Sequence, residues 1–221
     1  MDSKFIELKN LETYPEYQMI QRSEWFNNFL QTRRTIREFS KENLPIEIIE
    51  NCIKAAGSSP SGANKQPWHF VLAKNPEVKH KIRIAAEEEE NKFYSEKATD
   101  EWLKDLEPFE TNAEKPFLED APYLIAVFEE KYSIDEKGKT YKNYYTKESV
   151  GIATGMLITA LHYCGLAILT HTPSPMNFLN EILHRPKNEK PFLLLVVGYP
   201  KKNTKVPNIK RKEFEKICTK F

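Results

Sequence analysis

The sequence predicts an α+β fold in which a mixed sheet is wrapped by helices. Residues 122–129 and 192–198 are short, nearly continuous apolar runs, which is typical of buried strands. Residues 147–163 are the most apolar stretch with helical spacing. No internal repeat or low-complexity linker interrupts the chain of 221 residues, so we expect a single domain over residues 1–221.

Apolar spacing and boundary residues predict the elements of the N-terminal half. Residues 15–31 carry apolar side chains at helical spacing. A second helix is expected to start at Pro45 and to end at Gly57, because proline suits a first helical turn and glycine a C-terminus. A strand is predicted over residues 68–73, and a third helix over residues 76–94.

The segment after this third helix has weak periodicity. Residues 95–120 are charged and aromatic, and irregular stretches inside a compact domain are usually functional or disordered. We therefore expect a mobile cover over about residues 91–120. Residues 131–143, which are rich in lysine, are predicted to form a loop.

The helix at 147–163 has a face of small residues. Gly151, Gly155 and Thr159 recur every four residues, so another backbone can approach them closely. Gly165 is expected to cap the helix. The remaining predicted elements are a strand at 166–170, a short helix at 177–183 and a basic, polar C-terminal extension at about 200–221. We expect this extension to reach a partner subunit.

Charge and cysteine content narrow the class of protein. The formal net charge of +1 gives no general attraction to nucleic acid or to an anionic membrane. The three cysteines lack CxxC spacing and leave one thiol over in any disulfide scheme, which fits a reducing compartment. The first residues lack the apolar core of a signal peptide, and the apolar runs are shorter than the ~20 residues of a membrane span. We expect a cytoplasmic protein that does not associate with membranes.

Several common motifs are absent. With 7 glycines, the chain contains no GxGxxG, no GxxxxGK[ST] and no HExxH. The five histidines show no metal-ligand spacing, so no metal is predicted. If the protein binds a phosphate group, arginine side chains must provide much of the binding.

Arginines cluster near the end of the first predicted helix. Arg33, Arg34 and Arg37 lie within five residues, and guanidinium groups bind phosphate bidentately. Arg211 provides a further cation late in the chain. The alternative interpretation is a solvated patch beside a helix for the cluster and a solvated tail for Arg211.

A turn precedes the strand at 68–73. Pro60, Ser61 and Gly62 form a tight turn of small residues, which lets backbone N–H groups approach the flat polar edge of a ligand. Ser61 has no recognisable His and Asp partners, so we do not propose a serine nucleophile. Together with the arginines, this turn suggests a phosphorylated, planar cofactor.

A carboxylate, a phenol and an ammonium group form a second candidate site. Glu90 and Tyr94 share a helix face at i and i+4, and Lys115 follows in the expected cover. The three would suit an amino-acid zwitterion, whereas the alternative is a solvated helix face. Thr172 follows a predicted strand, where its hydroxyl could bind a ring nitrogen of the cofactor; the alternative is a turn-starting threonine before Pro173.

These residues resemble a known family. The segments RRTIREF, PSGANKQPW, GIATGMLITALHYCGL and VGYP are similar to the flavin-dependent nitroreductase superfamily. Within it, HKIRIAAEEEENKFY, LTHTP, HRPKNEKPFLLLVVGYP and VPNIKRK resemble the iodotyrosine deiodinase family. The resemblance runs from about residue 20 to the end. It implies an intertwined homodimer that binds two FMN molecules at the subunit interface.

The resemblance also assigns roles to residues. Thr172 matches a catalytic hydroxyl near flavin N5, and His171 interrupts what is a threonine run in close relatives. The positions that match FMN contacts are Arg33, Arg34, Thr35, Pro60, Ser61, Gly62, Thr170, Thr172 and Arg211. The positions that match substrate contacts are the backbone N–H of Ala63 and the side chains of Glu90, Tyr94 and Lys115.

The implied reaction is FMN-dependent reductive dehalogenation of halotyrosines, which converts mono- and diiodotyrosine to tyrosine and iodide. An external donor, NAD(P)H directly or through a reductase, would supply the electrons. One alternative is a broad-specificity NAD(P)H-dependent nitroreductase or quinone reductase. The other is a non-catalytic protein that binds FMN or halotyrosine.

Overall fold

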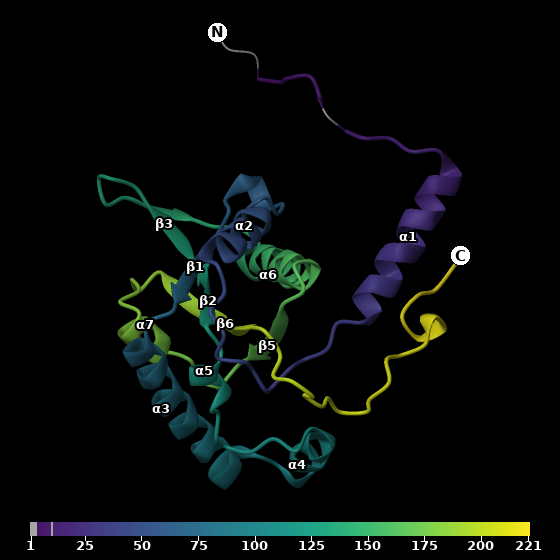
Figure 1. The fold of residues 1–221 in the computed structure, drawn as a ribbon. Helices are drawn as coiled ribbons and strands as arrows, with labels where there is room; N and C mark the ends of the chain where they lie inside the picture. The colour runs from purple at the N-terminus through teal and green to yellow at the C-terminus, as the bar shows by residue number, and fades with distance from the viewer. Residues whose placement is uncertain (1–3, 10) are drawn as a thin grey trace. The chain divides into compact units, whose positions relative to one another are not determined.

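The computed structural model describes residues 4–9 and 11–221 (Figure 1). The chain divides into two units, Met1–Arg33 and Arg34–Phe221. The first unit contains helix α1 (Glu16–Gln31), as the apolar spacing predicts. The rings of Trp25 and Phe29 stack on this helix, with their centroids 5.4 Å apart.

A four-stranded sheet forms the centre of the second unit. Its order is β1 (Trp68–Ala73), β2 (Tyr123–Glu130), β6 (Glu189–Gly198) and β5 (Ala167–His171), and neighbouring strands are antiparallel. An isolated parallel bridge between Thr35 and Ile168 adds an extended segment beside β5, which makes the sheet mixed. The predicted α+β fold is confirmed.

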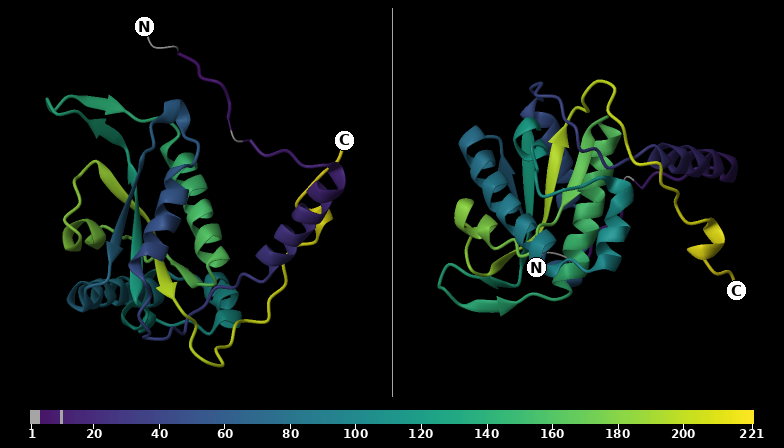
Figure 2. Two further views of the ribbon diagram at one scale, coloured as in Figure 1. Left: turned by 45° about the horizontal axis from the view of Figure 1, so that its top comes forward. Right: turned by 90° about the horizontal axis from the view of Figure 1, so that it is seen from below.

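Helices cover both faces of this sheet (Figure 2). Helices α2 (Ile46–Gly57) and α6 (Thr146–Tyr163) share one hydrophobic cluster with Tyr123 and Ile125 of β2. Helices α3 (Pro76–Lys92), α5 (Phe117–Asp120) and α7 (Phe178–Ile182) share the other cluster with Leu124 and Ala126. Successive β2 side chains therefore enter opposite layers, as the two-residue period of a strand requires.

Helix α3 leads into the segment that we expected to be a cover. It begins with Pro76 in its first turn and with the side chain of Asn75 accepting hydrogen bonds from two backbone N–H groups. It continues into a π-helical turn, η2 (Phe93–Lys97), followed by α4 (Asp100–Leu106), η3 (Glu107–Phe109) and α5. These elements are too short to produce clear periodicity. Phe117 and Leu118 of α5 belong to the core.

The predicted loop at 131–143 was wrong, because this segment forms a hairpin. Strands β3 (Tyr132–Ile134) and β4 (Thr140–Lys142) pair antiparallel. The Asp135 carboxylate accepts hydrogen bonds from the N–H groups of Lys137 and Lys139, and Gly138 takes a φ of 78°. Three-residue strands are too short to display an alternating pattern in the sequence.

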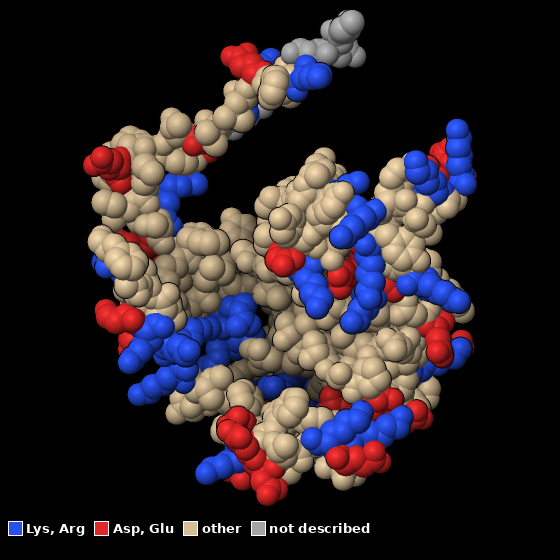
Figure 3. Space-filling view, turned by 180° about the vertical axis from the view of Figure 1, so that it is seen from behind, with Lys and Arg blue, Asp and Glu red and all other residues tan. Residues whose placement is uncertain are grey.

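The chain after β6 is mostly irregular. Apart from η4 (Phe214–Lys216), the described residues beyond Pro200 form no helix or strand. On the face in Figure 3, acidic side chains are scattered, whereas several basic side chains gather left of the centre. Within the described ranges, no helix combines the length and the apolar character that crossing a membrane requires.

Candidate functional site

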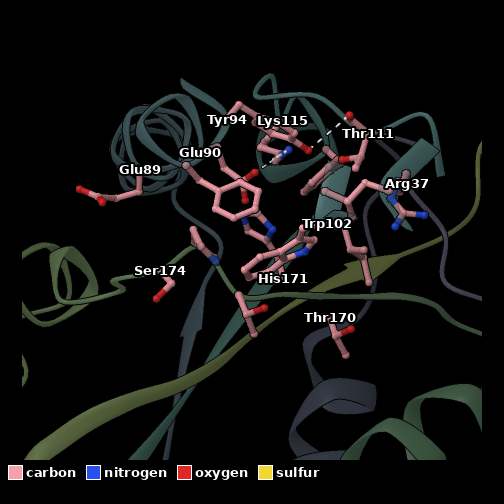
Figure 4. Close-up of a pocket in the computed structure, with 16 residues that line it drawn as sticks. Arg37, Glu89, Glu90, Tyr94, Trp102, Thr111, Lys115, Thr170, His171 and Ser174 are labelled. Carbon is pink, nitrogen blue, oxygen red and sulfur yellow. Dashed lines mark hydrogen bonds and ion pairs between the residues drawn. The ribbon is translucent and has the colours of Figure 1, made fainter. Parts of the chain in front are cut away.

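A cavity of about 280 Å³ lies where the end of α3, the expected cover and the end of β5 meet (Figure 4). All of its lining residues belong to the second unit. They are Arg37, Glu89, Glu90, Phe93, Tyr94, Trp102, Leu106, Thr111, Lys115, Phe117, Leu169, Thr170, His171, Thr172, Pro173 and Ser174. The cavity thus brings together Glu90, Tyr94, Lys115, Thr170 and Thr172, which sequence reasoning predicted as site residues.

An ion pair between a buried lysine and a partly buried glutamate lines this cavity. The Lys115 Nζ lies 3.2 Å from Glu90 Oε2, and these side chains are 4% and 15% exposed. The Lys115 ammonium also donates a hydrogen bond to the Asn112 carbonyl. Since the attraction between opposite charges is stronger away from water, the shielding of this pair strengthens the attraction between its two side chains.

Glu87 fixes the backbone at Lys115. Its Oε1 accepts a hydrogen bond of 2.6 Å from the Lys115 N–H and one of 2.8 Å from Arg83 Nε. Burial by itself raises the pKa of Glu87, but these bonds and the nearby positive charges outweigh burial and lower the pKa. An ionised Glu87 therefore ties the end of the expected cover to helix α3.

Aromatic rings surround the ion pair. The Tyr94 hydroxyl donates a hydrogen bond of 3.3 Å to the Thr111 carbonyl, and the Lys115 Nζ lies 5.8 Å from the Tyr94 ring centroid. Phe93 packs edge-to-face with both Tyr94 and Trp102, at centroid distances of 5.3 Å and 4.7 Å. Figure 4 shows the Tyr94 ring beside the ion pair. The cavity therefore offers an anion, a cation, a phenol and flat apolar surfaces.

Strand β5 places its last residues at the cavity. Thr170 is exposed and His171 is buried, because alternate residues of a strand face opposite sides. His171 is 7% exposed and packs edge-to-face against Phe117, at a centroid distance of 5.6 Å. Burial, followed by the positive charges of Lys115 and Arg37, lowers the pKa of His171 to about 3. The imidazole is therefore neutral at neutral pH.

Sequence reasoning missed the position of Arg37 and of Trp102, and both line the cavity. The Arg37 guanidinium lies 5.6 Å from the Phe109 ring centroid, and burial lowers its pKa. A cation at this point could bind an electron-rich edge of a planar cofactor. Arg37 belongs to the arginine cluster that the sequence shows. The spacing within that cluster does not indicate that Arg37 lines the cavity while Arg34 lies outside it.

The predicted turn presents two backbone donors. Ala63 takes the left-handed conformation with a φ of 50°, and the Ser61 Oγ accepts a hydrogen bond of 2.9 Å from the Gln66 N–H. Among the described residues, no hydrogen bond uses the N–H of Gly62 or of Ala63. Such a pair of free donors suits the polar edge of a ligand, as the cofactor hypothesis requires.

Gly62 is required by its surroundings. A Cβ at this position would lie 2.9 Å from Tyr145 Cδ2 and 3.2 Å from the Tyr144 carbonyl oxygen. The turn therefore packs against the residues that precede α6. It does not line the cavity of Figure 4 within one copy of the chain.

The predicted phosphate ligands also lie outside this cavity. The Arg34 guanidinium donates a hydrogen bond to the Pro207 carbonyl, which connects the second unit's start with the C-terminal extension. Thr35 pairs with Ile168, two residues before Thr170. Arg33 ends the first unit, and Arg211 lies in the extension. Over the described ranges, no group of three or more His, Cys, Asp and Glu side chains could hold a metal ion.

Comparison with known proteins adds to this geometry. Residues 30–199 match the model of the nitroreductase family. Iodotyrosine deiodinase of Haliscomenobacter hydrossis is 52% identical over 209 residues, which cover 95% of this chain and 94% of that protein. Iodotyrosine deiodinase 1 of Homo sapiens is 43% identical over 205 residues, which cover 92% of this chain and 71% of that protein.

A solved structure is also similar. The crystal structure of oxidized iodotyrosine deiodinase bound to FMN and 3-iodo-L-tyrosine matches with a TM-score of 0.74 and 33% sequence identity. The match covers 85% of this chain and 95% of that chain.

Proposed function

The chain belongs to the nitroreductase family, and we propose from this premise that it is an FMN-dependent oxidoreductase that removes iodide from iodotyrosine. The single observation that carries the proposal is the buried Glu90–Lys115 ion pair beside Tyr94 in the cavity. It agrees with the family resemblance of the motifs and with the relatives at 43% and 52% identity.

FMN is the cofactor, and several groups of this chain suit it. Arg34 has a neutral carbonyl as its partner, so its charge remains available for a phosphate; Arg33 and Arg211 are further candidates. Thr35, Pro60, Ser61 and the free N–H of Gly62 suit the rest of the cofactor. When bound in its reduced form, FMN supplies two electrons that, with one proton from solvent, convert a C–I bond to C–H and release iodide.

The ion pair explains the choice of an amino acid as substrate. A zwitterion that enters the cavity gives its ammonium to Glu90 and its carboxylate to Lys115, so both buried charges keep an opposite charge. A ligand with one charge would leave one of them without compensation, which is costly away from water. Closure of residues 91–120 over the ligand would therefore select for both charges.

Two further groups orient the reacting ring. The Ala63 N–H holds the phenolate oxygen, whose ionisation near neutral pH is favoured by an iodine in the ortho position. Thr172 would donate its hydroxyl to the flavin ring near N5 and is the catalytic side chain of this proposal, and Thr170, which lines the same cavity, would contact the cofactor as well. Tyr94 completes the set of substrate contacts with its phenol.

A homodimer would complete the site. The turn at residues 60–63 and the cavity lie in different places on one copy of the chain, so a second copy can bring them together. In support, α6 exposes Ile152, Met156 and Tyr163, and the space beside Gly155 is open. The extension at 200–221 exposes Ile209, Phe214 and Ile217 for such an interface. Sedimentation of the FMN-loaded protein tests this state.

The deciding experiment is an anaerobic assay of the dithionite-reduced, FMN-loaded protein with mono- and diiodotyrosine. We expect stoichiometric iodide and tyrosine. Binding without iodide release would indicate a sensor, and fast reduction of nitroaromatics with poor binding of iodotyrosine would indicate a broad-specificity nitroreductase. The same assay with NADH, NADPH or an added reductase identifies the external electron donor.

The three free cysteines support a reducing compartment, for which we propose the cytoplasm.

A further inference from the structure

We propose that His171 is a substrate-binding residue that donates a hydrogen bond to the α-carboxylate of the amino acid, beside Lys115. This inference rests on the proposed function, because it concerns the same cavity. It assigns a role to a side chain that the proposed function does not use.

The first observation is a buried nitrogen without a partner. Among the described residues, His171 Nε2 is the one buried side-chain nitrogen or oxygen that has no hydrogen-bond partner. The side chain is more than nine-tenths buried and lines the cavity. A buried polar atom left unpaired is costly, so a partner that arrives with a ligand would relieve that cost.

The second observation is the sign of the charges around the imidazole. Two cations act on it, Lys115 and Arg37, and both line the same cavity. Glu90 is engaged with Lys115, and Glu89 forms an ion pair of 2.8 Å with Lys92 and points away from the cavity in Figure 4. Lys115 is balanced by Glu90, so Arg37 leaves the neighbourhood of His171 with one positive charge in excess, which an incoming carboxylate would balance.

The shape of the ring permits the contact. A half-turn of the imidazole about its Cβ–Cγ bond exchanges nitrogen and carbon positions without a change in volume. The neutral ring carries one N–H, which can thus be presented to either edge. The rival explanation is packing alone, with a ring N–H against the face of Phe117, with which His171 is in edge-to-face contact.

The experiment compares two ligands and three substitutions in the FMN-loaded protein by calorimetry. The ligands are 3-iodotyrosine and 3-iodotyramine, which lacks the carboxylate. His171→Leu removes the donor, His171→Asn keeps an N–H, and His171→Thr replaces the ring with a smaller hydroxyl donor. Thermal unfolding of each FMN-loaded variant without ligand shows whether the fold and the cofactor are retained.

For His171→Leu, we expect the affinity for 3-iodotyrosine to fall about tenfold or more, the scale of losing a hydrogen bond to a charged group. The affinity for 3-iodotyramine should not change, and His171→Asn should recover part of the loss. The melting temperature of His171→Leu should not fall, because the substitution removes an unpaired polar atom.

Equal losses for both ligands, or no loss for either, would overturn the proposal and leave His171 as a packing residue. A variant that loses FMN or melts at a lower temperature would likewise count against it. Failure of the proposed function looks different, since the unsubstituted protein itself would then not bind 3-iodotyrosine.

Discussion

Glu90 of α3 and Lys115 of the expected cover form an ion pair of 3.2 Å in which the lysine side chain is buried and the glutamate side chain is partly buried. The pair joins the wall of the cavity to the segment that would close over a ligand. When a zwitterion enters, Glu90 and Lys115 separate, and each takes an opposite charge of the ligand in place of the other. In the proposed function, closure of the cover is therefore coupled to recognition of the zwitterion.

Substitution Glu90→Gln tests this coupling. The variant should bind 3-iodotyrosine more weakly by about 1–3 kcal/mol, because the ligand ammonium loses a charged partner. It should also lose stability, since Lys115 stays buried without its carboxylate. Calorimetry and urea unfolding measure these effects. Glu88→Gln is the matched control, because Glu88 is exposed on the same helix; equal ligand affinity in both variants would remove the zwitterion argument.

Substitution Gly62→Ala tests the turn that presents the backbone donors. An added Cβ meets Tyr145 and the Tyr144 carbonyl, so we expect a loss of stability of about 1–3 kcal/mol and weaker FMN binding. Gly57→Ala is the control, because no atom lies within 4 Å of its added Cβ. Flavin fluorescence titration reports the cofactor affinity. If both variants bind FMN alike, the turn does not contact the cofactor.

The neutral, buried His171 predicts a dependence of stability on pH. Its pKa is lowered to about 3, whereas the usual pKa of an exposed imidazole is 6.5. Between these values the unfolded state binds more protons than the folded state, so stability falls as the pH drops. Relative to His171→Leu, the unsubstituted protein should lose about 1.4 kcal/mol per pH unit below about pH 6.5. Urea unfolding at several pH values measures the difference, and parallel curves for the two proteins would refute the assignment.

Thr172 should affect chemistry more than binding. For Thr172→Ala we expect iodide release to slow about three- to tenfold, the scale of one neutral hydrogen bond, with little change in FMN affinity. Thr172→Ser keeps the hydroxyl and should retain most of the rate. Rapid-mixing measurements of iodide release after anaerobic reduction compare the three proteins, and an unchanged rate in the alanine variant would rule out a hydroxyl contact.

The layers of the fold follow from the sequence because they depend on local patterns. The continuous apolar runs of β2 and β6 identify buried strands, and α2 buries Ile49, Cys52 and Ala56 at the spacing of one helix face. The hairpin of β3 and β4 could not be predicted in this way, because its strands are too short to show a period.

The site was predicted less completely, because it depends on contacts between distant segments. Spacing alone predicted Glu90 and Tyr94 on one face of a helix, with Lys115 in the expected cover as the third member, and the resemblance assigned substrate contacts to all three. Side chains alternate along β5, so His171 shares a face with Leu169 and could have been predicted to be buried. Its burial was not predicted, because a histidine is polar and rarely marks a buried face. The position of Arg37 depends on how the segment after Arg34 runs beside β5.

Binding of three ligands to the FMN-loaded protein tests the central claim most directly. These are 3-iodotyrosine, the amine that lacks its carboxylate and the acid that lacks its ammonium group. The account predicts that each singly charged analogue binds at least about tenfold more weakly than the zwitterion, because one buried charge then stays uncompensated. Equal affinity for all three ligands would contradict it.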